Sequence, residues 1–303
     1  MKNSLVVKDN ILINASYNLD LVEQRLVLLA ILEARKSKKG INANSEITIH
    51  ASSYIENFNV EKHTAYEVLK QACEDLFHRQ FSYRFINDSA HSEYVRSRWV
   101  SKISYVDNQA LVRIIFAPDV IPLITRLEEH FTSYQLKQVT QLSSRYALRL
   151  YELLISWRKV GKTPIFEIAL FREQLGVDEK LYNRIEAFKR RVLEPTIEQL
   201  NTYTDIVVKY EQHKKGRSIT GFSFCFKEKK NKEISTTKSV IEKLTTKQIC
   251  FFAKKLAHLP EFSKFSKIGE DYNEFAFRLQ KELTDPQKLV LYKPYLDKIS
   301  RES

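Results

Sequence analysis

Apolar side chains recur along this chain with two periods, which predict an alternation of helices and strands. Spacing of three and four residues places apolar side chains on one face of a helix. It predicts helices over about residues 21–35, 61–77, 145–159 and 177–201, shorter helices ending near Asn57 and Gly176, and a looser helical stretch from Pro118 toward Leu142. Strands are predicted over 46–50, 79–86, 95–106, 110–117, 164–170, 205–211 and 218–226, where β-forming residues cluster or alternate with polar ones.

The order helix, strand, helix, helix, hairpin occurs twice, and it is the order of a winged helix. The segments FNVEKHTAYEVLKQA and LGVDEKLYNRIEAFKRR also share a similar entry into the longer helix of each half. One architecture used twice predicts an α+β protein with two tandem winged-helix domains, at residues 1–135 and 136–228.

The composition changes after Lys227, where the charged stretch KEKKNKEISTTK predicts a linker. Amphipathic patterns then predict helices over about 246–258, 271–283 and 287–299. Residues 229–303 therefore form a linker and a helical C-terminal extension, whose partner the sequence leaves open.

The predicted helix 177–201 has one apolar and one cationic face. Leu181, Ile185, Phe188 and Val192 share the apolar stripe, and the opposite face carries Lys180, Asn183, Arg184, Ala187, Arg190 and Arg191. Arg can bind guanine O6 and N7 with two hydrogen bonds, and Asn can do the same for adenine. Lys189 lies off this face, where a phosphate contact suits it better than a base. A charged face can also be plain solvated surface.

The distribution of charge favours the DNA interpretation. The chain has a net charge of +12, and by segment the excess is +1 over residues 1–140, +7 over 141–230 and +4 over 231–303. The hairpin that follows the cationic helix is basic as well, with Lys209, His213, Lys214, Lys215 and Arg217. A winged helix places its second helix in the major groove and its wing on the backbone, so both basic features occur where one docking geometry needs them.

Enzymatic motifs are missing from the sequence. Gly161-Lys162-Thr163 resembles half of a phosphate-binding loop, but Ser156 stands where that motif requires glycine, and a predicted helix precedes it instead of a strand. The seven histidines form no metal-binding spacing, and the three cysteines lie far apart. We therefore expect no catalysis, no cofactor and no metal. No signal peptide or run of 18 apolar residues is present, so we expect a cytoplasmic protein without membrane contact.

Several of these segments together resemble the iteron-binding plasmid replication initiators. They are RYALRLYELLISWRK, FREQLGV, YNRIEAFKRRVLEPTIEQLN, the KYEQHKKGRSITGFSFCF hairpin and, nearer the N-terminus, LVVKDNILINASYNLDLVEQRLVLLAI and EDLFHRQFSY. The resemblance spans roughly residues 5–227. It implies binding to directly repeated origin sequences in double-stranded DNA, with Lys180, Asn183, Arg184, Lys189, Arg190 and Arg191 as base-reading candidates.

The resemblance further implies a homodimer in exchange with a monomer. The dimer would repress the initiator's own gene, and the monomer would open the origin and engage the host replication initiator and helicase. The helix 61–77 presents Glu67, Glu74 and Asp75, which argues against deep groove insertion. Dimerisation suits the first domain better, with backbone contacts from Arg84, Arg96, Arg98 and Lys102; these could equally be ordinary solvated strand positions.

Two alternatives remain open from the sequence. A winged-helix transcriptional repressor without a replication role would share every DNA-binding feature described above. A protein-interaction scaffold whose positive charge serves acidic partners is a second class.

Overall fold

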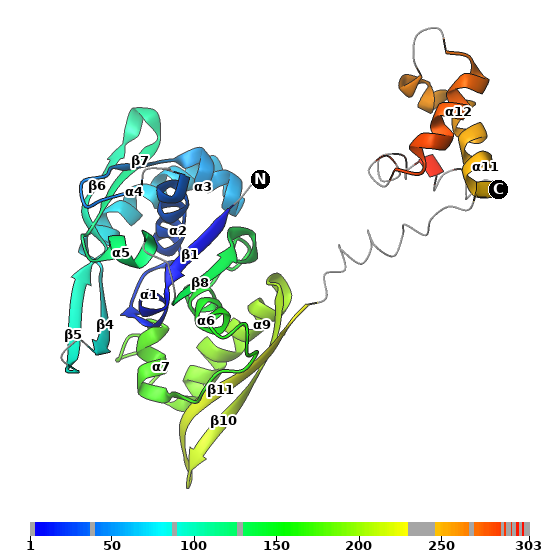
Figure 1. Cartoon of the computed structure of the whole chain (residues 1–303). Coiled ribbons are helices and arrows are strands. Elements are labelled where there is room, and N and C mark those ends of the chain that lie inside the picture. The colour runs from blue at the N-terminus through cyan, green and yellow to red at the C-terminus, as the bar shows by residue number, and fades with distance from the viewer. Residues whose placement is uncertain are drawn as a thin grey trace. The chain divides into compact units, whose positions relative to one another are not determined.

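The computed structural model describes residues 4–36, 40–86, 90–125, 130–229, 246–266 and 270–285, together with 288, 292, 295, 296 and 299. Its contacts divide the chain into a unit ending at Lys229 and a second unit beyond it. Figure 1 shows the first unit as a mixture of helices and small sheets, and the described residues of the second as helices.

The first winged helix is built from α2 (Leu21–Lys36), β3 (Ile47–His50), α3 (Ala51–Phe58), α4 (Lys62–His78), β6 (Val100–Val106) and β7 (Leu111–Phe116). The three strands pair in the order β3-β7-β6. On α4 the predicted apolar stripe is confirmed, because Ala65, Leu69, Ala72, Cys73 and Leu76 are buried. Burial raises the pKa of the Cys73 thiol to about 12, so this thiol is a packed apolar group at neutral pH.

The second winged helix repeats this plan. It consists of α6 (Arg145–Ile155), β9 (Phe166–Glu167), α7 (Ile168–Gln174), a long helix over Ile185–Tyr203, and the strands β10 (Ile206–Lys215) and β11 (Ser218–Glu228). Its sheet order, β9-β11-β10, matches β3-β7-β6, since the first strand pairs with the last in both halves. The prediction of two tandem winged helices is thereby confirmed.

Elements outside the repeated plan surround the first winged helix. They are β1 (Leu5–Asp9), α1 (Asn10–Asn14), β2 (Ser16–Tyr17), β4 (Gln80–Ile86), β5 (Ser92–Arg98), α5 (Val120–Thr125) and β8 (Phe131–Gln135). The sequence predicted one strand from Val95 to Val106. This prediction is wrong, because the chain divides at the buried Trp99 into β5 and β6, which belong to different sheets. The predicted helical stretch from Pro118 toward Leu142 is confirmed over α5 but is wrong over residues 131–135, which pair with 5–9 as an antiparallel strand.

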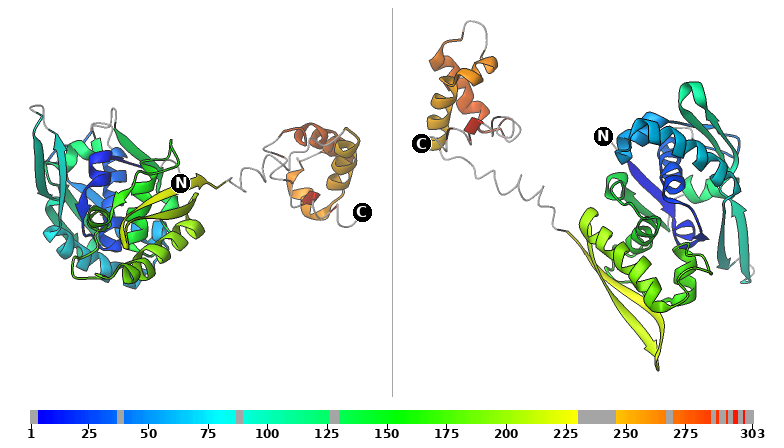
Figure 2. Two further views of the ribbon diagram at one scale, coloured as in Figure 1. Left: turned by 90° about the horizontal axis from the view of Figure 1, so that it is seen from below. Right: turned by 180° about the vertical axis from the view of Figure 1, so that it is seen from behind.

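A buried ionic cluster joins the two halves of the first unit. The Arg149 guanidinium on α6 donates to the carbonyls of Ile13, Ala15 and Gln174, to the Tyr17 hydroxyl and to Glu152, at 2.6–3.0 Å. The Glu152 carboxylate also accepts from Lys8 Nζ at 2.7 Å and from the Tyr134 hydroxyl at 2.6 Å. These bonds tie α6 to β1, β2 and β8, so the second winged helix packs directly on the N-terminal strands (Figure 2).

The second unit has its own core. The helices α11 (Thr246–Ala257) and α12 (Tyr272–Glu282) pack together, with a 3-10 turn over Pro260–Phe265 between them. Buried side chains include Leu256, Phe262, Phe275, Leu279 and Tyr292. The predicted helices 246–258 and 271–283 are confirmed; much of the third, 287–299, lies outside the described residues.

Candidate nucleic-acid interface

The helix that begins at Ile185 is the central element of the candidate interface. It is shorter than predicted, because residues 177–184, here called the connecting turn, are not helical. The preceding helix α7 ends in a Schellman arrangement, in which Val177 N–H donates to the Arg172 carbonyl and Gly176 N–H donates to that of Glu173. Gly176 has a φ of 70°, and a Cβ at this position would lie 2.4 Å from the Tyr17 carbonyl. The chain therefore has to turn at Gly176 before a new helix can start.

The predicted base-reading residues consequently belong to two elements. Lys180, Asn183 and Arg184 lie on the connecting turn, which corrects their placement on the helix, whereas Lys189, Arg190 and Arg191 lie on the helix itself. Of these six side chains, all but the half-buried Lys189 are exposed. Four of the cations, Lys180, Arg184, Arg190 and Arg191, have no ion-pair partner among the residues that the structure describes. The correction therefore changes the element but leaves an exposed cationic surface.

A wide turn interrupts the helix where Arg190 and Arg191 are found. Residues Lys189–Leu193 form a π-helical turn, in which Glu194 N–H donates to the Lys189 carbonyl five residues earlier. Pro195 explains this geometry, because it has no N–H and its ring collides with the carbonyl four residues before it. The apolar side remains anchored by Phe188, Val192 and Leu193, which are all buried. Arg190 and Arg191 are thereby presented to solvent from a helix that is fixed on its opposite side.

The wing is longer than the sequence predicts. Strands β10 and β11 extend to a two-residue tip, Gly216-Arg217, so Lys214 and Lys215 lie on the strand beside the tip rather than within a loop. A β-bulge at His213 and Lys214 increases the local twist. Figure 1 shows this hairpin projecting beyond the helices of its domain. Lys209, Lys214, Lys215 and Arg217 are exposed along it.

Lys189 connects the helix to the wing. Its Nζ donates to Gln212 Oε1 at 3.3 Å and lies 6.0 Å from the centre of the Tyr210 ring. The Lys189 side chain thus lies against β10 and is half-buried, whereas Arg190 and Arg191 are exposed.

The candidate arginines of residues 1–135 lie on the β4–β5 hairpin, beside the first winged helix. Arg84 and Arg96 flank the Tyr94 ring, at 5.3 and 6.0 Å from its centre. Arg98 donates to the Phe77 carbonyl at 2.9 Å. All three are exposed, and Lys102 on β6 instead pairs with Glu46 at 3.3 Å. The hairpin therefore offers cationic side chains, and part of the hydrogen-bonding capacity of Arg98 is already used.

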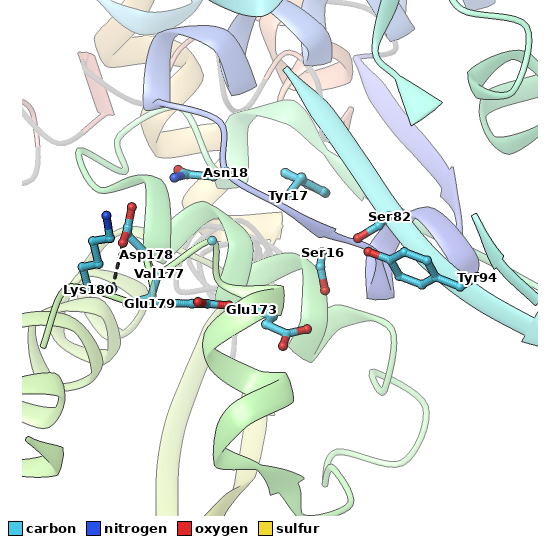
Figure 3. Close-up of a pocket in the computed structure, with 11 residues that line it drawn as sticks. Ser16, Tyr17, Asn18, Ser82, Tyr94, Glu173, Val177, Asp178, Glu179 and Lys180 are labelled. Atoms are coloured by element: carbon cyan, nitrogen blue, oxygen red, sulfur yellow. Dashed lines mark hydrogen bonds between the residues drawn. The ribbon is translucent and has the colours of Figure 1, made fainter. Parts of the chain in front are cut away.

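A hollow of about 460 Å³ lies between the connecting turn and the strands β2, β4 and β5. Figure 3 shows Glu173, Asp178 and Glu179 around it, together with Ser16 of β2 and Tyr94 of β5. The Asp178 side chain accepts a hydrogen bond from the backbone N–H of Lys180 at 2.8 Å. Carboxylates therefore line the hollow on one side of the turn, and such a rim would repel phosphate.

The Gly161-Lys162-Thr163 string proves to be part of the sheet. Thr163 N–H donates to the Phe224 carbonyl and Phe226 N–H donates to the Gly161 carbonyl, both at 2.9 Å. Thr163 is buried, and its hydroxyl accepts from Phe224 N–H. These atoms are committed to pairing with β11, as a tight turn between helix and strand requires.

Across the described residues, no cluster of three or more His, Cys, Asp or Glu could hold a metal ion. No described helix has both the length and the apolar character needed to cross a bilayer.

Arg172 is a residue of this site that the sequence did not reveal. Its guanidinium donates to the backbone carbonyls of Leu181 and Tyr182 on the connecting turn. No pattern could have identified it, because a single Arg on a short helix looks like any solvated cation.

Comparison with known proteins agrees with this architecture. A family model described as "Initiator Replication protein, WH1" matches residues 5–155, and one described as "Initiator Rep protein, WH2" matches residues 167–226. A replication initiation protein of Escherichia coli is 24% identical over 221 residues, which cover 72% of this chain and 67% of that protein.

Two solved structures are also similar. The Pi initiator protein in complex with iteron DNA is 22% identical, with a TM-score of 0.62 over 76% of this chain and 100% of that one, which shows a shared fold. The WH1 domain of MSBI1.176, a replication protein isolated from a multiple sclerosis patient, is 66% identical over 40% of this chain and 92% of that domain, with a TM-score of 0.34.

Proposed function

The chain belongs to the initiator Rep protein family, with its WH1 and WH2 domains, and from this premise we propose that it initiates plasmid replication by binding direct repeats in double-stranded DNA. The second winged helix is the main reader. Its connecting turn and the first turns of helix 185–203 enter the major groove, and its wing contacts the backbone.

One observation carries the proposal. The connecting turn and the following helix expose Lys180, Arg184, Arg190 and Arg191, none of them in an ion pair within the described chain, and the basic wing belongs to the same domain. A protein binds DNA by neutralising phosphates with Lys and Arg side chains, and these four exposed cations are available for that. Arg184, the N-cap residue of the helix that begins at Ile185, makes no side-chain capping hydrogen bond, so the first N–H groups of this helix can meet a phosphate.

For residues 1–135, which contain the first winged helix, we propose a dimerisation role with auxiliary DNA contacts. Strand β5 is the outer strand of the β2-β4-β5 sheet, so its outer edge can pair with another strand. Ile86 and Tyr94, on the same hairpin, are 76% and 52% exposed. In this proposal residues 1–135 form the dimerising domain, residues 136–228 form the main DNA-reading domain, and residues 229–303 form an extension. The dimer would repress the gene that encodes this chain.

Further partners follow from the family. The monomer would open the origin and engage the host replication initiator and helicase in the cytoplasm. Arg84, Arg96 and Arg98 would contact the DNA backbone beside the repeat. The proposal contains no catalytic step.

Footprinting on the DNA upstream of the coding region tests the proposal. We expect protection that recurs about every 20 base pairs, or two helical turns, across direct repeats. Protection of a single inverted repeat alone would favour a transcriptional repressor. An unprotected region at moderate salt would favour a scaffold for acidic partners.

A further inference from the structure

We propose that Arg172 is a positioning residue that holds the connecting turn in the conformation in which Lys180, Asn183 and Arg184 can meet DNA. This inference rests on the proposed function. It assigns a specificity-determining role to a residue that need not touch DNA itself.

The geometry is that of a two-pronged clamp. Arg172 Nη1 donates to the Tyr182 carbonyl at 2.9 Å, and Nη2 donates to the Leu181 carbonyl at 2.6 Å. The backbone carbonyl of Arg172 also accepts from Val177 N–H at 2.9 Å. One residue of α7 thereby binds the connecting turn at its beginning and near its end.

The clamp is itself anchored. The Arg172 guanidinium carbon lies 5.3 Å from the centre of the Phe188 ring, and Phe188 is fully buried. A planar guanidinium can stack on an aromatic face and donate in a fixed fork at once, which a lysine ammonium cannot. The clamp therefore fixes the turn relative to the first turn of the following helix.

The turn needs such a restraint because its backbone is unfavourable. Tyr182 has a φ of 55°, a left-handed conformation that non-glycine residues seldom adopt. Such residues keep this conformation only where their surroundings impose it. Leu181 is 43% exposed, and Tyr182 is only partly buried where it packs against the core, so core packing restrains these two residues incompletely. The two bonds from Arg172 add to this restraint, immediately before Asn183 and Arg184.

The clamp has a measurable consequence. If Arg172 acts by placing Arg184, then removing either side chain removes the same interaction, and the two losses do not add. If Arg172 bound DNA independently, the losses would multiply. Because both Nη groups already bind carbonyls, we expect the first behaviour.

A double-mutant cycle on the full chain tests the inference. Affinities for a duplex carrying one direct repeat would be measured for wild type, Arg172→Ala, Arg184→Ala and the double variant. We expect Arg184→Ala to bind about tenfold more weakly and Arg172→Ala at least as weakly, because it also releases Lys180 and Asn183; the double variant should bind as Arg172→Ala does. A double variant that binds about tenfold more weakly than Arg172→Ala, or an unchanged Arg172→Ala, would overturn the clamp. Wild type that fails to distinguish the repeat from a scrambled duplex would instead refute the proposed function.

Two further variants separate positioning from charge and from stability. Arg172→Lys keeps the charge but lacks the fork, so it should lose affinity as Arg172→Ala does; full affinity would reduce Arg172 to an electrostatic contribution. Arg158→Ala is the matched control, because Arg158 binds Asp205 and Glu228 rather than the turn. Its effect on affinity should be independent of Arg184→Ala. Coupling equal to that of Arg172 would mean general destabilisation and would overturn the assignment.

Discussion

The Glu152 carboxylate is buried with two cations, Lys8 and Arg149, and with the hydroxyls of Tyr17 and Tyr134. Burial alone would raise the pKa of this carboxyl, but the neighbouring Lys8 and Arg149 charges outweigh burial and lower it below the ordinary value of 4.5. Glu152 therefore stays ionised and neutralises charges that would otherwise be isolated in the core.

Replacing Glu152 by Gln should lower the free energy of unfolding by about 3–5 kcal/mol, because two buried cations lose the counterion that they share. Urea titration at neutral pH would measure the change. The matched control is Glu33→Gln, which breaks the exposed pair with Lys36 and should cost less than about 1 kcal/mol. Equal small losses in both variants would show that the cluster does not stabilise the contact between the winged helices.

The same carboxyl predicts a pH dependence. Since its pKa is lower in the folded chain than in the unfolded chain, its contribution is complete above pH 4.5 and is lost as the pH falls through the folded pKa. Wild type should therefore lose stability below pH 4.5 more steeply than Glu152→Gln, as followed by urea titration at successive pH values. Parallel curves would contradict this role.

At the scale of elements, the wing separates positioning from sequence reading. Lys214 and Lys215 are exposed beside the tip. In the proposed docking they would contact phosphates rather than bases. Replacing either by Ala should reduce the slope of log affinity against log salt by about one, with little change in the preference for the repeat. Salt titration with cognate and scrambled duplexes would measure both quantities.

Arg191→Ala provides the contrast for the wing, because a base contact should reduce the cognate preference by about 1–3 kcal/mol. If the Lys214 and Lys215 variants keep the wild-type slope, the wing lies outside the interface.

Hydrophobic periodicity predicted the helices and strands whose own sequence pattern fixes their conformation. It failed where contacts with residues far away in the sequence determine the conformation. The amphipathic pattern of α4 and the repeated order of helix, strand, helix, helix and hairpin were sufficient to predict two winged helices. Strand β8 was missed because its partner strand β1 is far away in the sequence: Leu5 pairs with Gln135 and Asp9 pairs with Phe131. The connecting turn was predicted as helix because Leu181 and Ile185 keep helical spacing; Gly176 and the Arg172 clamp override that pattern.

The candidate site was predicted by chemistry better than by geometry. Arg190 and Arg191 are exposed on the expected helix, whereas Lys180, Asn183 and Arg184 precede it. Charge and exposure follow from residue type and pattern, but backbone conformation at Tyr182 depends on bonds from another helix.

At the scale of the whole molecule, the residues up to Lys229 and those from Thr246 have separate cores. The family models also end at Phe226. We therefore expect residues 1–229 alone to fold and to bind the direct repeat with an affinity within about twofold of the full chain, because neither the core nor the proposed interface of this unit draws on the extension.

Fluorescence anisotropy with the repeat duplex and urea unfolding of both chains would test this independence. Phe275→Asp in the full chain is the matched variant: it places a charge in the small core, whose Phe275 is 2% exposed, while keeping the chain length. It should abolish the transition of the extension and leave that of the first unit unchanged. A tenfold loss of affinity on truncation, with Phe275→Asp causing the same loss, would instead make the folded extension a part of the DNA-binding surface.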